Sequence, residues 1–237
     1  MNAPTDLAAA TENREKTLSE RIYNQIRRDI LEGKLDPGLK LRFELLRSKY
    51  DAGTSTLRES LTRLTAEGLV VAEGQRGFRV APVSLKDLWD ITRLRQQLET
   101  EAVRRSIAIG DDRWESEVLA AYHRLSKLRD KKTGQLLLLT DETVERHRTF
   151  HFSLFSACDS PWLIRFISTL HDHSERYRRF STLHATRPRR THDEHKAILA
   201  AIMARDATLA CSLIHEHLES TAKVVSSIAK DWQSKAA

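Results

Sequence analysis

Cysteine is scarce in this sequence, and no segment has the composition of a membrane anchor. The two cysteines, Cys158 and Cys211, belong to no CxxC pair, which argues against a disulfide framework and favours two core thiols in a reducing compartment. No apolar run approaches the roughly 20 residues that span a bilayer. The first residues carry acidic side chains and lack the basic-then-apolar order of a secretory leader. We therefore expect a cytoplasmic protein without a membrane partner.

Glycine and proline are also few, and they are unevenly distributed. Most of the 8 Gly and 5 Pro lie before residue 83. The remaining composition, 40% hydrophobic and 30% charged, is that of a globular protein rather than a disordered one. The change in texture predicts a loose tail over 1–17, a small domain over 18–83, a larger domain over 84–231 and a short tail over 232–237.

The charge balance is basic, with a formal net charge of +6. A positive charge permits an acidic partner such as DNA. Lysine and arginine also form ordinary solvated faces, however, so the charge alone leaves both interpretations open.

The smaller domain shows helical periodicity that gives way to a hairpin. Leu18, Ile22, Ile26 and Ile30 recur every fourth residue, which indicates a helix with one buried face. The predicted elements are a first helix from about 18 to 31, helices over 42–50 and 54–67, and strands over 69–72 and 78–80. Helix, turn, helix and then hairpin is the order of a winged helix-turn-helix.

Two local details of this domain can be predicted as well. On the second helix we expect Leu45, Leu46 and Tyr50 to face inward. Thr56 and Glu59 have the spacing of a capping box, which marks the start of the third helix.

The larger domain is helical throughout, because helical periodicity persists and no strand pattern occurs. The predicted helices cover about 84–109, 112–130, 138–158, 161–182, 189–204 and 207–231. Ser84 and Asp206 are plausible N-caps. The fold class is therefore mainly α, a winged helix-turn-helix followed by an all-α bundle.

Polar and basic residues lie where a winged helix would meet DNA. A recognition helix needs such groups near its N-terminus, where the backbone N–H groups also suit a phosphate. The candidates on the second helix, the third helix and the wing turn are Arg42, Arg47, Thr54, Ser55, Thr56, Arg58, Arg63, Gln75, Arg76 and Gly77. The alternative is that they are ordinary surface residues of a small domain.

The ten histidines all follow residue 120, and four of them fall on apolar helix stripes. His147 and His151 are spaced i, i+4 on one stripe, while His195 and His217 lie on inward stripes of two later helices. Imidazoles that converge in a bundle interior can bind one metal ion, and they suit Zn, Ni, Cu or Fe better than Mg or Ca. The alternative is a set of satisfied or half-exposed side chains, which is our interpretation for His123, His171, His173, His184, His192 and His215.

The motifs of the first half resemble the GntR family of transcriptional regulators. The matching runs are Leu35-Asp36-Pro37-Gly38, Thr56-Leu57-Arg58-Glu59-Ser60-Leu61, Glu67-Gly68-Leu69-Val70 and Arg76-Gly77-Phe78-Arg79-Val80. The resemblance implies a regulator that binds double-stranded operator DNA, with Arg58 at the position of a DNA-contacting arginine. An arginine that the family pattern places at Thr54 is absent, so the operator is expected to differ from common family sites.

The second half resembles the FCD ligand-binding domain of the FadR-type branch of that family. Its motifs correspond to Arg95 with Glu99, to His147-Arg-Thr-Phe150-His151, and to His195 and His217. The resemblance implies a divalent metal, most simply Zn, with Ni or another transition metal as alternatives. His147 stands where many members have Asp, which makes the ligand set softer and less anionic.

The same resemblance implies a small-molecule effector and a homodimer. Arg95 could hold a carboxylate with two hydrogen bonds, and Tyr177 and Arg178 are further pocket candidates. A buried ion pair with Glu99 is the alternative for Arg95. Several stretches, among them Lys40-Leu41-Arg42 and Trp114-Glu115, are similar to a glutarate-responsive repressor of this branch, which implies a small organic acid such as a dicarboxylate.

Two other functions compete with this hypothesis. A regulator of the same fold could respond to the metal itself, because ligand types do not separate a structural metal from a regulatory one. A metal-dependent hydrolase would need a general base beside an activated water, and no HExxH pattern occurs. An enzyme is therefore not expected.

Overall fold

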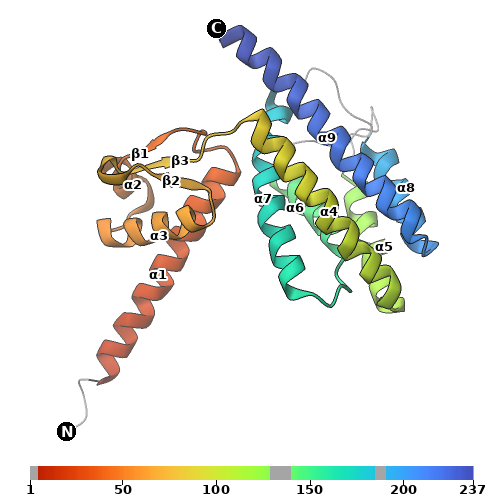
Figure 1. Ribbon diagram of the computed structural model, residues 1–237. Helices are drawn as coiled ribbons and strands as arrows, with labels where there is room; N and C mark the ends of the chain where they lie inside the picture. Colours follow the sequence, from red (N-terminus) through yellow and green to blue (C-terminus); the bar gives the residue numbers. More distant parts are fainter. Residues whose placement is uncertain (1–4, 129–139, 185–190, 237) are drawn as a thin grey trace. The chain divides into compact units, whose positions relative to one another are not determined.

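The computed structural model describes residues 5–128, 140–184 and 191–236, and it divides into two compact units (Figure 1). Unit 1 comprises Met1–Ser84 and unit 2 comprises Leu85–Ala237. The division falls one residue later than the boundary expected from the sequence. No helix in the described part of the chain is both long and apolar enough to cross a bilayer.

Unit 1 has the element order of a winged helix-turn-helix, as predicted. Its elements are α1 (Thr5–Leu31), β1 (Lys40–Leu41), α2 (Phe43–Tyr50), α3 (Thr54–Ala66), β2 (Val70–Ala72), a 3-10 turn (Gly74–Arg76) and β3 (Phe78–Val80). The strands form an antiparallel sheet in the order β1-β3-β2. We call the β2–β3 hairpin the wing.

The core of unit 1 forms where α1 packs on α3. Ile22 and Ile26 are fully buried, and so are Leu57 and Leu61, which follow the i, i+4 spacing of their helix. Each such side chain contributes about 1.5–3 kcal/mol by leaving water. The predicted helical stripes therefore correspond to the buried faces, and they fix how the two helices pack.

Several local expectations for unit 1 are wrong. α1 begins at Thr5, so residues 5–17 continue the helix where a loose tail was expected. α3 begins at Thr54 with Gly53 as N-cap and no side-chain cap bond. The capping box fails because Thr56 already lies inside the helix, whereas an N-cap needs an extended backbone. Leu45 is 65% exposed rather than inward.

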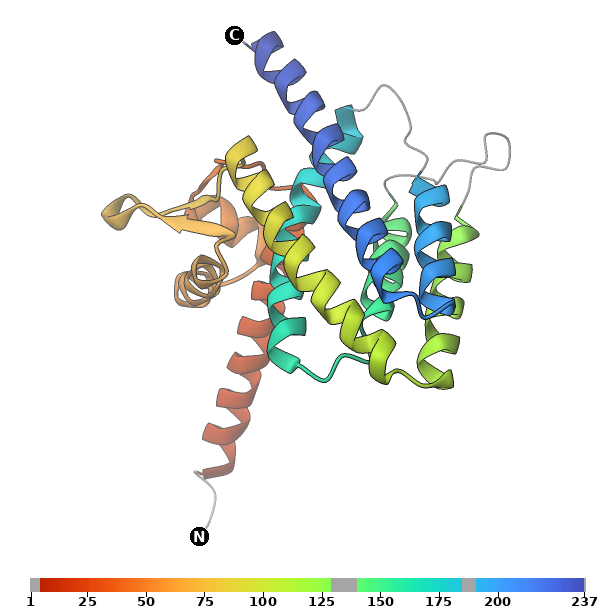
Figure 2. The same cartoon turned by 45° about the vertical axis from the view of Figure 1, so that its right-hand side comes forward.

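Unit 2 consists of helices throughout its described residues, which confirms the predicted all-α bundle. They are α4 (Leu85–Ile109), α5 (Asp112–Ser126), α6 (Asp141–Leu154), α7 (Pro161–His184), α8 (Thr191–Met203) and α9 (Ala207–Ala236). Figures 1 and 2 both show α4 and α9 side by side, and these two helices pack along much of their length. The predicted C-terminal tail over 232–237 lies largely within α9, which extends to Ala236.

Polar caps and one arginine define the ends of the unit 2 helices. The predicted N-cap Asp206 accepts a hydrogen bond from the Leu209 backbone at 2.9 Å, whereas the N-cap role of Ser84 stays a prediction. At the same end of the bundle Arg205 pairs with Glu115 and donates to the carbonyl oxygens of Ile107 and Gly110. This arginine therefore joins the α8–α9 turn to the α4–α5 turn.

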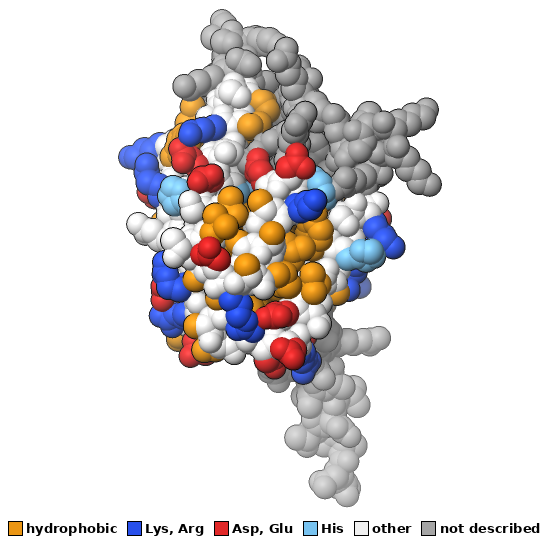
Figure 3. Space-filling view, turned by 90° about the vertical axis from the view of Figure 1, so that its right-hand side faces the viewer, with side chains coloured by type: hydrophobic (Ala, Val, Ile, Leu, Met, Phe, Trp, Pro, Cys, Tyr) orange, Lys and Arg blue, Asp and Glu red, His pale blue; other side chains and the backbone are white. Residues whose placement is uncertain are grey.

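Apolar side chains also reach the surface of unit 2. The face shown in Figure 3 carries a central group of hydrophobic side chains with charged side chains around it. Trp162 and Phe166 on α7 are 65% and 56% exposed and lie with their ring centroids 6.1 Å apart. Exposed aromatic pairs of this kind are typical of surfaces that contact another molecule.

Candidate metal centre and nucleic-acid interface

The four histidines singled out by the sequence converge in unit 2. His147 and His151 come from α6, His195 from α8 and His217 from α9. One ligand nitrogen from each ring lies within 4.8 Å of the others. Neighbouring ring centroids are 4.4 Å apart for His147 and His151 and 4.9 Å apart for His195 and His217. The structure therefore brings together residues that are up to 70 positions apart (217 minus 147).

The surroundings of these rings favour neutral imidazoles. Burial lowers the pKa of His147 and His151 well below the usual value, and the nearby imidazoles lower it further. Arg178 has the same effect on His147, and Arg95 on His151. A neutral imidazole presents a lone pair, which is the form that binds a metal.

Unsatisfied polar atoms in the cluster indicate that something else belongs there. His151 is 2% exposed, and neither of its ring nitrogens has a hydrogen-bond partner. The buried Nδ1 of His147 also has none. An unpaired buried polar atom costs about 1–3 kcal/mol, so four converging imidazoles with such atoms fit a divalent metal ion that prefers nitrogen ligands.

Two further residues contact the cluster, and one of them, Glu194, was not identified from the sequence. The carboxylate of Glu194 accepts a hydrogen bond from Nδ1 of His217 at 2.7 Å. Phe150 is fully buried, and its ring meets the rings of His151 and His195 edge-on at centroid distances of 5.6 and 5.2 Å. Phe150 was recognisable as part of a motif. The contact of Glu194 on α8 with His217 on α9 depends on how each helix is rotated about its axis, which the spacing of apolar residues in the sequence does not determine.

Two of the three effector candidates line one narrow pocket. Arg95 and Tyr177 face it from α4 and α7, and its other lining residues are Leu88, Thr92, Ser174, Leu218, Thr221, Ala222 and Val225. Arg95 pairs with Glu99 at 2.6 Å, which was the alternative interpretation, and also donates to Ser174 at 2.8 Å. The Tyr177 hydroxyl donates to Asp87 at 2.6 Å.

Arg178, the third candidate, lies near the histidines but outside that pocket. Its guanidinium donates two hydrogen bonds to the carboxylate of Glu175, at 2.8 and 2.7 Å. A neighbouring polar network includes His171, which is a satisfied side chain, as the sequence interpretation had it. That histidine is 5% exposed and contacts Arg148 at 3.0 Å, and Arg148 also forms an ion pair with Asp172.

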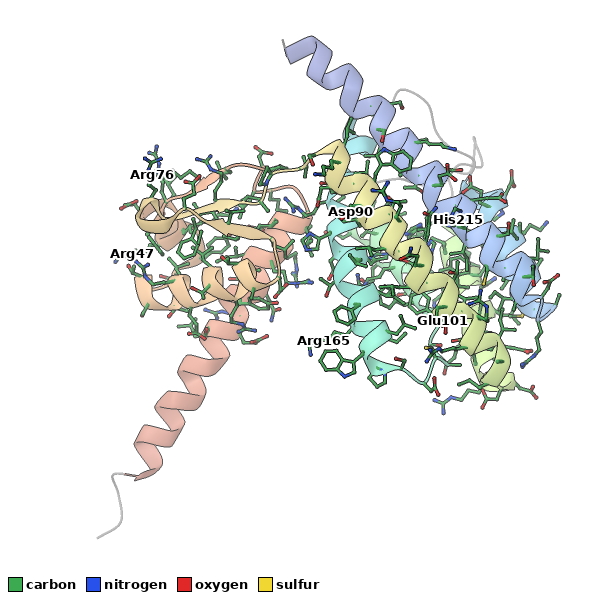
Figure 4. All side chains as sticks on the ribbon, viewed as in Figure 1. Arg47, Arg76, Asp90, Glu101, Arg165 and His215 are labelled. Atoms are coloured by element: carbon green, nitrogen blue, oxygen red, sulfur yellow. The ribbon has the colours of Figure 1, made fainter. Side chains whose placement is uncertain are left out.

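Most of the predicted DNA-contacting side chains lie on the surface of unit 1. Figure 4 shows Arg47 and Arg76 pointing away from the body of the unit. The exposed members of the predicted set are Arg42, Arg47, Thr54, Ser55, Arg58 and Arg76, whereas Thr56 is half-buried and the Gln75 side chain lies outside the described residues. These residues lie at the N-cap and on the exposed side of α2, in the first turns of α3 and at the wing turn.

Two members of the predicted set differ from the rest. Arg63 forms an ion pair with Glu20 at 2.9 Å and lies 3.9 Å from the ring centroid of Tyr23, so it faces α1. Gly77 has φ of 96°, and a Cβ there would meet no atom within 4 Å. Glycine is therefore needed at this position for the backbone conformation of the wing turn rather than for lack of space.

One residue of the wing was not identified from the sequence. Arg79 on β3 donates to the carboxylate of Glu73 at 2.8 Å and also to the carbonyl oxygen of Gly38. It thereby connects the two sides of the wing turn to the segment before β1. A cross-strand contact of this kind could be found only after the register of the sheet was known.

Comparisons with known proteins agree with this architecture. Residues 18–80 match the family of bacterial regulatory proteins described as the gntR family, and residues 90–220 match the FCD domain. The chain is 40% identical over 210 residues to an uncharacterized HTH-type transcriptional regulator, BphR, of Paraburkholderia xenovorans, which covers 89% of this chain and 86% of that protein. It is 38% identical over 200 residues to the HTH-type transcriptional repressor GlaR of Escherichia coli, with 83% and 90% covered.

A solved structure shows the same fold. Escherichia coli McbR/YncC superposes with a TM-score of 0.71 over 91% of this chain and 98% of that one, at 20% sequence identity. The segment that matches the gntR family lies within unit 1, and the segment that matches the FCD domain lies within unit 2. The relatives are named as transcriptional regulators rather than as enzymes. The chain therefore belongs to the gntR family of bacterial transcriptional regulators, in the branch whose DNA-binding domain is followed by an FCD domain.

Proposed function

We propose that this protein is a transcriptional repressor whose affinity for operator DNA is controlled by a small organic acid bound at a metal centre in unit 2. The convergence of four histidine nitrogens within 4.8 Å carries this proposal. A domain that served only to join two copies of the DNA-binding unit would not need a buried cluster of this kind. The repressor role rests on the relative GlaR, which is named as a repressor.

The DNA-binding half of the proposal rests on the exposed face of unit 1. The first residues of α3 combine hydroxyl side chains with the N-terminal backbone N–H groups of a helix, which suit phosphate and base edges. Arg58 projects from the same turn and lies 5.1 Å from the ring centroid of Phe43. Arg42 and Arg47 on α2 and Arg76 at the wing add positive charge to this face.

The sensing half rests on His147, His151, His195 and His217, which would hold a divalent metal, with Zn the simplest choice and Ni another. When bound, such an ion could accept a carboxylate as a fifth ligand, because zinc can expand its coordination from four to five. Arg95 provides a second positive group, because it lies close enough to lower the pKa of His151. A ligand set without a carboxylate of its own favours an anionic effector, which is why we propose an organic acid, for example a dicarboxylate such as glutarate.

We further propose a homodimer. Two copies would read two half-sites of a near-palindromic operator, as two-fold symmetric helix-turn-helix proteins do. The exposed Trp162 and Phe166 are apolar surface that a second copy could cover. In this scheme the effector favours one arrangement of the unit 2 helices, and α4 passes the change to the segment that leads to unit 1.

Reciprocal titration tests the coupling between the two sites. DNA selected by the protein from a random pool would be titrated with and without glutarate, succinate and citrate, and each acid would be titrated with and without DNA. Thermodynamic linkage requires that an acid which weakens DNA binding tenfold is itself bound tenfold more weakly by the DNA complex. The proposal fails if no acid changes DNA affinity, or if the two factors differ.

The histidine requirement has a matched control. His151→Ala removes a buried ring of the cluster, whereas His123→Ala removes an exposed ring on α5. We expect only His151→Ala to lose both metal and the response to acid while DNA binding persists. Retained metal and response in His151→Ala would contradict the proposed site.

A metal-responsive regulator is the second candidate function, and one observation favours it. The cluster offers four nitrogen ligands, which is the full number for a closed tetrahedral zinc site. In that case metal alone would change DNA affinity, and acids would have no effect on the metal-loaded protein. The same titrations therefore separate the two candidates.

A further inference from the structure

We propose that Glu194 is a positioning residue of the metal centre, which holds His217 with its Nε2 toward the cluster and thereby raises metal affinity. This inference rests on the proposed metal function. Glu194 would not itself be a ligand. Its part is to fix one ring before the metal arrives.

The hydrogen bond decides which nitrogen of His217 is available. Glu194 Oε2 lies 2.7 Å from His217 Nδ1, and the carboxylate can only accept, so Nδ1 carries the hydrogen. A neutral imidazole has one N–H and one lone pair, and the lone pair is therefore on Nε2. Metal-bound histidines commonly donate their other N–H to a carboxylate, which fixes the tautomer and the ring orientation.

The position of Glu194 in the sequence links two ligands. It directly precedes His195 on α8, and its side chain reaches α9, where His217 is 5% exposed. One turn of α8 therefore supplies a ligand and also supports the ligand from the next helix. A shift of α8 along α9 would displace both rings together.

Charge gives a second reason for a carboxylate at this position. The four imidazoles of the cluster contribute no negative charge, whereas Arg95 and Arg178 act on it as positive groups. The carboxylates of Glu99 and Glu175 pair with those two guanidinium groups, so a divalent cation at the cluster would gain from a further negative charge. Glu194 supplies a negative charge one hydrogen bond away from the ligands, which strengthens the donor nitrogen of His217.

The competing explanation is a plain contact between α8 and α9. The Glu194 side chain is 32% exposed, and a partly exposed ion pair often contributes less than about 1 kcal/mol to stability. Such a contact would change the stability of the metal-free protein and leave metal affinity, relative to that protein, unchanged. The two explanations therefore differ in what they predict for metal binding.

The test compares Glu194→Gln and Glu194→Ala with Asp193→Asn in the full chain. Glutamine keeps a neutral acceptor, alanine removes the acceptor, and the exposed Asp193 is a charge-matched neighbour on the same helix turn. Zinc affinity would be measured by competition with a chromogenic chelator, and the ligand field by the visible spectrum of the Co²⁺ form. In the metal-free protein, ¹⁵N chemical shifts of His217 report which nitrogen carries the hydrogen.

We expect Glu194→Ala to lower zinc affinity by about 10- to 100-fold, Glu194→Gln to lower it less, and Asp193→Asn to leave it unchanged. We also expect the metal-free Glu194→Ala protein to show a mixture of His217 tautomers where the parent protein shows one. Unchanged zinc affinity and an unchanged tautomer in Glu194→Ala would overturn the inference. A parent protein that binds no metal would overturn the proposed metal function as well, and so the two failures are distinguishable.

Discussion

The two units of this protein place their functional side chains in opposite environments. Unit 1 presents arginines and hydroxyl groups on its surface, over a core that is almost entirely apolar, whereas unit 2 buries histidines, arginines and carboxylates among its helices. All ten histidines belong to unit 2. The proposed ligands would account for this difference, because DNA is too large to enclose, whereas a metal ion and a small acid bind best where water is excluded.

This contrast has a consequence for stability. Substitution of an exposed arginine in unit 1 should change the fold little, even where it removes a proposed contact with DNA. Substitution of a buried residue in the cluster of unit 2 changes the core and the site together. Function and stability are therefore separable in unit 1 and coupled in unit 2.

Metal removal should give the largest difference between the units. We expect a chelator to lower the stability of unit 2 by about 4 kcal/mol for metal at a thousandfold excess over its Kd, and to leave unit 1 unchanged. Differential scanning calorimetry of the full chain, with and without chelator, would measure this as a shift of one of two transitions. Equal shifts of both transitions would show that the units do not unfold independently.

A cavity in the core of unit 1 should give the reverse result. Leu57→Ala removes a fully buried side chain of α3, and we expect it to cost about 3 kcal/mol and to weaken DNA binding. The metal content of unit 2 should not change. Leu45→Ala is the control, because that leucine is 65% exposed and its loss should change the free energy of unfolding by less than about 0.5 kcal/mol.

Mild acid should distinguish the units again. Burial lowers the pKa of His147, His151 and His171 in the folded protein, so the unfolded chain takes up their protons first as the pH falls below about 6.5. Metal-free unit 2 should keep its full stability at about pH 7.5 and lose it progressively as the pH falls through and below about 6.5. Unit 1, which has no histidine, should not respond between pH 7.5 and 6.

The smallest expected effect is on DNA affinity, and it distinguishes Arg58 from Arg63 on α3. Arg58→Ala should weaken DNA binding by about 1–3 kcal/mol and, for a phosphate contact, should reduce the salt dependence by about one ion. Arg63→Ala should weaken it by less than about threefold, because Arg63 is engaged by Glu20 and Tyr23. Fluorescence anisotropy at several salt concentrations would measure the DNA affinity of both variants. Equal losses of affinity would show that Arg63 leaves its ion pair to reach DNA.

Much of this architecture was predictable because it depends on repeated patterns. The stripe of Ile22 and Ile26 and the stripe of Leu57 and Leu61 gave the correct buried faces of α1 and α3. The convergence of four histidines was predictable because each lies on an apolar stripe, and apolar stripes meet in a bundle interior.

What could not be predicted depends on single side chains reaching between elements. The contacts of Glu194 with His217, Arg79 with Glu73 and Arg148 with Asp172 require known helix rotations or sheet register. The predicted helix over 54–67 agrees with α3, but the capping box predicted at Thr56 was wrong, because Gly53 is the N-cap and Thr56 already lies within the helix.

The four proposed ligands come from α6, α8 and α9, and this arrangement bears on how fast a bound ion would exchange. The opening of a single loop could not release an ion held, as proposed, by three helices, because both ring nitrogens of His151 are closed to solvent. Exchange must therefore wait for local unfolding of at least one helix, which occurs at a rate set by the stability of the bundle rather than by affinity alone. We expect each molecule to retain, over many cycles of effector binding, the ion that it acquired while folding.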